Sequence, residues 1–368
     1  MSECEIECQG KDRDAAREYS GAEAWEWFES VGRPVYWLAP MVGQSECAFR
    51  MLARRNGAHI CSTEMIDAAG YARSESYRAQ FPFHPEDRPL IVQLGGSNPA
   101  DLAAAAALAA PHCAAVELNV GCPQRCAKKG GYGAFLMEKR ELLAECVRSM
   151  ADAIRKSNPK AACLVKIRCF DDVAETVELA RMVRRCGCQC LTVHGRTRVQ
   201  GGGKRTGRWP ANWEWIRAVK QALDIPVISN GNIRTHRDIE ECLAATGADG
   251  VMSGCGMLRR PWIFLPQHPY QHAMNDLQLR VHAAAEYLST VEEFSSHPRQ
   301  VSKHIQNMIP APVMKQNDCV AKLVVKISCL INNHVPKELL SELICSIKQI
   351  KISDDMEHVD DDEDIAES

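Results

Sequence analysis

The chain has 368 residues, of which 46% are hydrophobic, and its 44 Lys and Arg against 47 Asp and Glu give a formal net charge of −3. This length fits one (β/α)8 barrel of roughly 250 residues together with a small appended domain. No apolar run approaches the roughly 20 residues of a membrane span, and the acidic N-terminus lacks the apolar region of a signal peptide. We therefore expect no membrane attachment and a cytoplasmic protein, with the nucleus as a second compartment.

The acidic residues are unevenly distributed along the chain. Residues 354–367 contain nine carboxylates and no Lys or Arg, so the rest of the chain carries a net charge of +6. The body of the protein is basic, as a nucleic-acid partner requires.

The 18 cysteines are scattered through the expected strands and helices. We therefore expect reduced, buried thiols and no disulfide framework. Cys186, Cys188 and Cys190 alternate like side chains at the start of a strand. Since no second cysteine or histidine pair stands nearby at ligand spacing, no metal site is predicted.

Residues 1–33 are predicted to be a polar N-terminal segment, in which residues 22–28 could form a short helix. From residue 36 onward, short continuous apolar runs predict eight strands that are buried on both faces. These strands are expected at residues 36–40, 59–63, 90–94, 115–119, 163–168, 190–194, 226–229 and 250–253.

Helical patterns separate the predicted strands, at residues 45–56, 98–110, 137–156, 172–185, 212–222 and 235–245. Ser45 and Asn98 are expected N-caps, and Gly57 and Gly247 are expected stops. Strict alternation of strands and helices predicts an α/β fold, a closed (β/α)8 TIM barrel over residues 34–268. A doubly wound open sheet is the alternative, but the Gly-x-Gly-x-x-Gly turn that usually follows its first strand is missing.

After about residue 269 the strand pattern stops. Apolar residues at helical spacing predict a small helical domain over residues 269–352, with helices at 277–294, 301–309, 320–331 and 339–350. Residues 310–312 and 335–336, which contain proline, are expected turns. The acidic residues 353–368 cannot bury apolar area and are expected to form a disordered tail.

Polar or small residues end nearly every predicted strand, at the side of a barrel where functional groups lie. Read in order, the residues at these ends are Pro40 with Met41, Glu64, Gln93, Asn119 with Cys122, Lys166 with Arg168, His194 with Arg196, residues 230–232, and Gly254. Because the strand ends of a barrel converge on one mouth, these residues predict a single binding pocket.

Lys166 ends a buried strand, where an unpaired ammonium is costly, so we expect an anionic partner there. A phosphate or the N1/O2 edge of a flavin would serve, and an ordinary ion pair to a carboxylate is the alternative. His194 precedes a Gly- and Arg-rich loop and can donate to an acceptor, although a lone His is often a satisfied core residue. The loops after residues 229 and 253 form the usual phosphate site of a barrel.

Cys122 follows the fourth predicted strand in the segment Leu-Asn-Val-Gly-Cys-Pro-Gln at residues 118–124. No general base accompanies it in this motif. A neutral thiol with an ordinary pKa of about 8.5 suits a proton donor better than a nucleophile.

Residues 196–208 form a Gly-rich basic loop beside the expected mouth. Its five cations, Arg196, Arg198, Lys204, Arg205 and Arg208, suit a polyphosphate partner. A solvated flexible loop with no partner is the alternative.

Six motifs closely resemble those of the tRNA-dihydrouridine synthases, flavoenzymes that reduce a uracil within tRNA. They are Leu-Ala-Pro-Met at 38–41, Gln-Leu-Gly at 93–95, the cysteine segment at 118–124, Val-Lys-Ile-Arg at 165–168, Thr-Val-His-Gly-Arg-Thr at 192–197 and Ser-Asn-Gly-Asn-Ile at 229–233. The extension at residues 127–136 most resembles the eukaryotic subgroup that acts on uridines 16 and 17 of the tRNA D-loop. The resemblance implies an FMN-dependent oxidoreductase with tRNA as substrate, NADPH as electron donor and a helical domain that binds tRNA.

The resemblance also implies the roles of single residues. Asn119 and Arg168 would contact the uracil, which must leave its stack to be reached. Cys122 would donate a proton to C5, while a hydride from the flavin reaches C6. The residues that would hold FMN are Pro40, Met41, Val42, Gln93, Lys166, His194, Asn230, Gly231, Asn232, Gly254 and Cys255.

The chain departs from the family pattern at three places. Cys255 stands where many flavin barrels have Arg, and Asn232 where many relatives have Asp. Residues 301–305 of the helical domain are less basic than in comparable relatives. The first departure shifts phosphate binding to backbone N–H groups and Lys166, and the last leaves fewer cations on the expected RNA-binding surface.

Two other functions are compatible with the sequence. One is an FMN barrel reductase of a small molecule, against which the basic loop and the helical domain argue. The other is a catalytically silent tRNA-binding protein, against which the joint presence of Cys122, Lys166 and His194 argues. We expect the protein to be a monomer.

Overall fold

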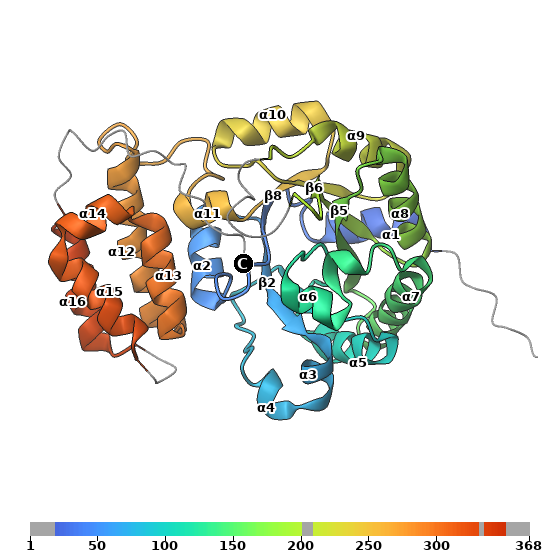
Figure 1. The fold of residues 1–368 in the computed structure, drawn as a ribbon, viewed down its shortest axis with the longest axis horizontal. Coiled ribbons are helices and arrows are strands. Elements are labelled where there is room, and N and C mark those ends of the chain that lie inside the picture. The colour runs from blue at the N-terminus through green and yellow to red at the C-terminus, as the bar shows by residue number, and fades with distance from the viewer. Residues whose placement is uncertain (1–18, 201–208, 331–334, 351–368) are drawn as a thin grey trace, which may run out of the picture.

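The computed structural model describes residues 19–200, 209–330 and 335–350. Eight parallel strands form a closed barrel in sequence order, with β8 paired to β1 (Figure 1). The predicted TIM barrel is therefore confirmed. The strands are β1 Tyr36–Leu38, β2 Ile60–Asp67, β3 Leu90–Gly95, β4 Ala115–Val120, β5 Ala162–Cys169, β6 Cys190–Thr197, β7 Val227–Asn230 and β8 Gly250–Ser253.

Two strands continue three or four residues beyond their predicted ends. β2 continues to Asp67, with a register shift against β3 between Ser62 and Met65, and β6 continues to Thr197. Glu64 and Arg196, expected at strand ends, therefore lie within strands. The apolar runs ended earlier because polar side chains with partners of their own follow them.

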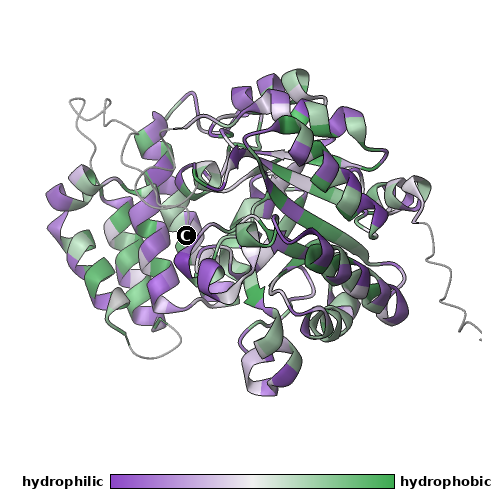
Figure 2. Cartoon of the chain, turned by 45° about the vertical axis from the view of Figure 1, so that its right-hand side comes forward, coloured by the Kyte–Doolittle hydropathy of each residue, from purple (hydrophilic) through white to green (hydrophobic). Residues whose placement is uncertain are grey.

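Amphipathic helices surround the barrel, and in Figure 2 they alternate between hydrophobic and hydrophilic colours. The helices between strands are α2 Cys47–Arg55, α3 Ala68–Arg73, α4 Glu75–Arg78, α5 Pro99–Ala109, α6 Arg125–Gly130, α7 Arg140–Ser157, α8 Val173–Arg185, α9 Trp213–Ala222 and α10 His236–Thr246. The short helix α11, Cys255–Arg259, follows β8, and 3-10 turns lie at Ala110–His112 and Gly133–Phe135. None of α3, α4, α6 and α11 was predicted, because each is too short to show a periodic pattern.

Two of the predicted helix caps, Asn98 and Gly247, are confirmed, and one, Ser45, is wrong. The Asn98 side chain accepts from the Asp101 N–H, and Gly247 ends α10 in the left-handed conformation. The prediction that Ser45 caps α2 is wrong, since Glu46 is the N-cap. The Ser45 hydroxyl instead bonds the backbone N–H and carbonyl of Met41, which tightens the turn after β1.

Helix α1, Gly21–Ser30, lies at the amino ends of the strands. Its Trp27 donates from Nε1 to the carbonyl of Ala114, just before β4, and its Trp25 donates to the carbonyl of Asp224, shortly before β7, both at 2.9 Å. The N-terminal segment thus closes the barrel on the side opposite its mouth. No helix in the described ranges is both long and apolar enough to cross a membrane.

In the described ranges, five helices follow α11, and they form a separate bundle drawn in orange and red beside α2 in Figure 1. The prediction of a turn at residues 310–312 is wrong, because a helix begins there and accommodates Pro312 in its first turn. The helices are α12 Asp276–Phe294, α13 Pro298–Met308, α14 Ala311–Gln316, α15 Asp318–Ser328 and α16 Lys337–Lys348. The acidic residues 353–368 lie outside the described residues.

The bundle docks on the barrel through a buried polar contact, which we call the Glu46 junction (Glu46, Tyr287, Ser296 and His304). The Glu46 carboxylate accepts from the Tyr287 hydroxyl at 2.7 Å and pairs with His304 Nε2 at 3.1 Å, and Ser296 Oγ lies 3.4 Å away. Burial by itself would raise the pKa of Glu46, but His304 and the Tyr287 hydroxyl bring it below its usual value. The carboxylate is therefore charged at neutral pH.

The junction predicts a large stability effect. Removing one partner of a buried ion pair costs about 3–5 kcal/mol, whereas an exposed pair contributes about 0–1 kcal/mol. We expect Glu46→Gln to lower the free energy of unfolding by about 3–5 kcal/mol at pH 7. Glu293→Gln, which breaks the exposed Arg55–Glu293 pair between α2 and α12, is the matched control with the smaller effect.

Urea unfolding of the two variants across pH checks this expectation. Because folding depresses the pKa of Glu46, its contribution is complete above the unfolded value of about 4.3 and is lost as the pH falls through the folded value. The gap in the free energy of unfolding between wild type and Glu46→Gln should therefore shrink as the pH falls into the acid range. Equal losses in Glu46→Gln and Glu293→Gln would contradict the assignment.

Candidate active site

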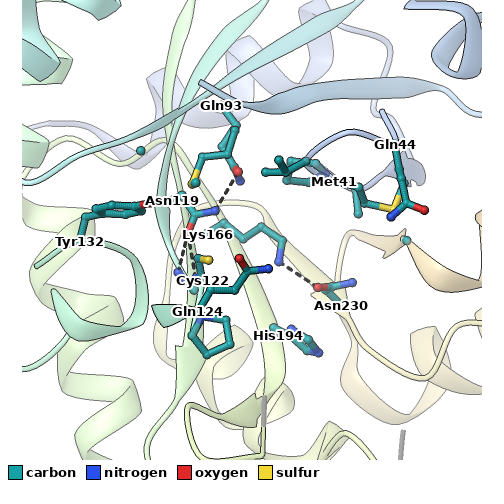
Figure 3. A pocket seen from close by; sticks show the side chains of 18 of the residues that line it. Met41, Gln44, Gln93, Asn119, Cys122, Gln124, Tyr132, Lys166, His194 and Asn230 are labelled. Atoms are coloured by element: carbon teal, nitrogen blue, oxygen red, sulfur yellow. Dashed lines mark hydrogen bonds between the residues drawn. The ribbon is translucent and has the colours of Figure 1, made fainter. Parts of the chain in front are cut away.

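A cavity of about 340 Å³ opens at the carboxyl ends of the strands (Figure 3). This volume lies in the range of ligand pockets, about 300–1,000 Å³. Most of the side chains predicted to form a pocket line it together. They are Pro40, Met41, Val42, Gln93, Asn119, Cys122, Lys166, Arg168, His194, Asn230, Gly254 and Cys255.

The cavity also has walls that the sequence analysis missed. Asp67 lies in the part of β2 beyond its predicted end, and Tyr77 lies in α4, which was not predicted. A longer prediction for β2 would have included Asp67 but not Tyr77. Gln124 and Tyr132 lie inside the quoted motifs, but no chemical role marked them. Further missed lining residues are Ala39, Gln44, Met65, Gly95, Gly121, Pro123, Cys126 and Leu258.

Lys166 projects from β5 into the cavity. Its ammonium donates to Asn230 Oδ1 at 3.0 Å, and the Asn230 amide donates in turn to the Met252 carbonyl at 2.9 Å. The nearby carboxyl of Glu117 in β4 is attracted to Lys166. Lys166, the predicted cation, is thus held in place by Asn230 at the end of β7.

His194 is a neutral donor in this site. Burial is the main reason that its pKa lies well below the usual value, and the cations Arg168, Lys166 and Arg196 lower it further. Arg196 Nη1 lies 2.9 Å from His194 Nε2, and because arginine only donates, Nε2 must accept. The ring proton therefore sits on Nδ1, which can donate to a ligand.

The loop that carries Cys122 is held from three sides. Asn119 Oδ1 accepts from the N–H groups of Gly121 and Cys122 at 3.0 and 2.9 Å. Arg168 Nε donates to the Gly121 carbonyl at 2.7 Å, and the Ala134 N–H donates to the Cys122 carbonyl at 2.9 Å. Both polar residues assigned to the uracil by resemblance thus also fix the position of the thiol.

Gly133 allows the extension at residues 127–136 to reach the cysteine loop. Its φ is +61°, and a Cβ there would lie 2.6 Å from the Cys122 carbonyl oxygen. A residue with a side chain would push the loop aside. The extension therefore supports the site directly.

The Cys122 thiol is protonated at neutral pH. Burial raises its pKa above the usual value and the adjacent Cys126 adds to this, outweighing the N–H of Gln124, Arg168 and Lys166, which lower it. This environment suits a proton donor and disfavours a thiolate nucleophile.

Arg196 was predicted to lie on the rim as an RNA contact, but the structure places it below the rim. It is only 5% exposed, and its guanidinium donates to Asn232 Oδ1 at 2.8 Å and to the Trp209 carbonyl at 2.7 Å, as well as to His194. The longer β6 turns this side chain inward. These contacts indicate that Arg196 holds His194 in position and does not contact a phosphate.

The remaining basic-loop residues differ in position. Arg198 pairs with Glu138 at 2.6 Å and lies over the Phe135 ring, 4.8 Å from its centroid. Lys204, Arg205 and Arg208 lie outside the described residues.

Gly231 and Asn232 do not line the cavity, although both were predicted to hold the cofactor. They follow β7 with positive φ angles of +116° and +64°. A Cβ at Gly231 would lie 2.6 Å from that of Ala211, and the Asn232 side chain points to Arg196. Both residues shape the turn behind His194.

No group of three or more His, Cys, Asp or Glu side chains in the described ranges is placed to hold a metal ion. Cys186, Cys188 and Cys190 are buried free thiols, which agrees with the prediction of reduced cysteines.

Comparison with known proteins adds to this geometry. Residues 37–331 match the family described as Dihydrouridine synthase (Dus). The chain is 42% identical over 279 residues to a Rattus norvegicus protein named tRNA-dihydrouridine(16/17) synthase [NAD(P)(+)]-like, an alignment that covers 75% of this chain and 59% of that one. It is 40% identical to the tRNA-dihydrouridine(16/17) synthase of Schizosaccharomyces pombe, over 73% of this chain and 66% of the relative. A Mus musculus tRNA-dihydrouridine(20a/20b) synthase-like protein is 38% identical over 65% of this chain and 71% of its own length. The chain thus spans less than two thirds of the length of the (16/17) relatives.

Proposed function

The chain belongs to the dihydrouridine synthase family, and from this premise we propose that it is an FMN-dependent tRNA-dihydrouridine synthase. In this proposal it reduces the C5–C6 double bond of uridines 16 and 17 in the tRNA D-loop, with NAD(P)H as electron donor. The observation that carries the proposal is a protonated thiol, Cys122, fixed by its backbone in a cavity that also holds Lys166 and a neutral His194.

The donors of the cavity fit FMN. Lys166 supplies a positive charge, His194 a neutral N–H, and Gln93 an amide, all facing one space. Apolar side chains such as Met41 and Leu258 line the same cavity and suit the face of a flat ring system. Gly254 and Cys255, which follow β8, lie where barrels bind phosphate.

Bound FMN would supply the hydride that reaches C6 of the uracil. The chain itself supplies the proton, since the Cys122 thiol can donate to C5 and is then reprotonated from solvent. Asn119 and Arg168 position the thiol through its loop. The cavity can admit only a base that has left its stack.

The substrate position rests on similarity to the (16/17) relatives, at 40–43% identity, above that to the (20a/20b) relatives, at 36–38%. The surface next to the mouth also suits RNA. A Cβ on Gly43, beside the cavity wall, would lie 3.8 Å from Lys303 Nζ of α13, so this exposed lysine reaches the mouth.

A reconstitution experiment tests the proposal. The purified protein with FMN and NADPH should form dihydrouridine at positions 16 and 17 of tRNA that lacks the modification, as mapped by sequencing. Free uridine is the control substrate. Reduction of free uridine without reduction of tRNA would favour a small-molecule reductase, and tRNA binding without any reduction would favour a silent binding protein.

The basic loop predicts a salt-dependent contribution to tRNA binding. Each phosphate contact changes the slope of log affinity against log salt by about 0.7–0.9. Neutralising Arg198, Lys204, Arg205 and Arg208 should weaken tRNA binding and flatten the slope in that proportion, with no change in bound flavin. We omit Arg196 because it is buried.

The matched control neutralises four exposed cations on the outer helices and the amino side of the barrel, Lys156, Lys160, Arg181 and Arg217. Filter binding across a salt series compares the two variants. If both variants retain the wild-type slope, the RNA surface lies elsewhere, with α13 as the next candidate.

A further inference from the structure

Glu117 is a fully buried carboxyl in the barrel interior, on β4, and it does not line the cavity. Its Oε1 accepts from Gln93 Nε2 at 2.7 Å, and its Oε2 accepts from Thr192 Oγ1 at 3.4 Å. Burial raises the pKa of this group, although Lys166 and the two hydrogen bonds oppose the rise. A buried carboxyl is costly to keep, so its partners indicate what it does.

A chain of hydrogen bonds leads from Glu117 to the cysteine loop, and Figure 3 shows the part of it from Gln93 through Asn119 to Cys122. Gln93 Oε1 accepts from Asn119 Nδ2 at 2.8 Å. Asn119 Oδ1 then accepts from the N–H groups of Gly121 and Cys122. We call these residues the Glu117 relay (Glu117, Gln93, Asn119 and the loop at Gly121 and Cys122).

The relay has a fixed direction. The N–H groups of Gly121 and Cys122 can only donate, so the oxygen of Asn119 must face them and its NH2 must face Gln93. The oxygen of Gln93 therefore faces Asn119, and its NH2 faces Glu117. If Gln93 turned over, its oxygen would face a carboxyl oxygen and its NH2 would face the NH2 of Asn119.

We propose that Glu117 is a positioning residue that fixes the orientation of Gln93 and, through Asn119, the loop that presents Cys122. The proposal rests on the proposed function for its catalytic meaning, while its structural content stands on the relay alone. The same orientation leaves the second amide hydrogen of Gln93 for a bound ligand.

Two substitutions at Glu117 separate hydrogen-bond acceptance from charge. Glu117→Met has a similar length but no oxygen acceptor. Glu117→Gln keeps an oxygen toward Gln93 and can donate its NH2 to the Thr192 hydroxyl. Ser62→Ala is the matched control, because Ser62 is also buried in the barrel and its hydroxyl has no hydrogen-bond partner in the described part of the chain.

The first readout is amide hydrogen exchange of peptides that cover residues 119–123, measured on the flavin-free protein. We expect faster exchange in Glu117→Met and wild-type exchange in Glu117→Gln and Ser62→Ala. The second readout is tRNA reduction by pre-reduced enzyme. Because a misplacement of 1 Å can cost about 10²-fold, the rate of tRNA reduction per bound flavin should fall about 10–100-fold in Glu117→Met, and Glu117→Gln should restore it.

Equal behaviour of Glu117→Met and Glu117→Gln in both readouts would overturn the proposal. If wild-type protein forms no dihydrouridine, the proposed function fails, but the exchange readout still decides the relay. If Glu117→Met does not fold, the exchanged pair Gln93→Glu with Glu117→Gln replaces it. In that pair the amide introduced on β4 donates to the carboxylate introduced on β3, which still accepts from Asn119. Loop exchange in the pair should therefore match wild type, whereas Gln93→Glu alone should accelerate it.

Discussion

Cys122→Ala is expected to slow uracil reduction by about 10²–10⁴-fold, the usual cost of losing a general acid. Flavin binding and flavin reduction by NADPH should be unaffected, because the thiol lies in a loop whose position is set by its backbone bonds and by Asn119 and Arg168. Pre-reduced enzyme mixed with tRNA measures the step directly. Cys126→Ala is the matched control, since Cys126 also lines the cavity but is exposed.

The pH dependence of this step follows from the environment of Cys122. Because burial raises its pKa, the thiol is fully protonated at neutral pH, and the rate should fall only as the pH rises through that elevated value. Normal dihydrouridine formation by Cys122→Ala would remove the proton-donor role. A rate that rises with pH through the alkaline range would instead indicate a thiolate.

Lys166→Met is expected to weaken FMN binding about 10–100-fold. A hydrogen bond to a charged group contributes about 1.5–3 kcal/mol, and each 1.4 kcal/mol corresponds to a factor of ten in affinity. The Met side chain has nearly the same length, so the barrel should fold. Equilibrium dialysis of FMN against the flavin-free protein measures the change.

The control for this prediction lies just before the same strand. Lys160 precedes β5 at the amino end of the barrel and is exposed, so Lys160→Met should bind FMN as wild type does. Equal affinity in the two variants would mean that the cofactor does not contact Lys166. It would also shift the expected phosphate site toward Gly254 and Cys255 alone.

The sequence predicted the position of a residue correctly where that position depends only on the strand that carries the residue. Continuous apolar runs predicted all eight strands, and their ends placed Cys122, Lys166 and His194 at one mouth. Arg196 was misplaced because the apolar run ended before the strand did, and one further strand residue decides whether a side chain faces the rim or the interior.

Residues whose partners come from other strands were harder to predict. Glu117 was not among the predicted site residues, because Gln93 and Thr192 approach it from β3 and β6 only after the barrel closes. Asp67 and Tyr77 were missed for a related reason, since short helices such as α4 show no periodic signal. The direction of the hydrogen bonds between the Gln93 and Asn119 amides likewise depends on all their partners in the folded protein, and no single sequence position reveals it.

The Glu46 junction has a consequence for how this architecture is inherited. Asn307 of the bundle donates to Gln44 at 2.6 Å, and Gln300 donates at 2.9 Å to Glu64, which also accepts from the Gly43 N–H. Gln44 lines the cavity, so the bundle holds one wall of the pocket in place. A bundle grafted from another barrel would leave the Glu46 carboxylate buried without its partner unless it also brought residues equivalent to His304 and Tyr287. A chimaera should therefore keep this wall of the pocket in place only when its bundle supplies a histidine and a tyrosine that reach Glu46.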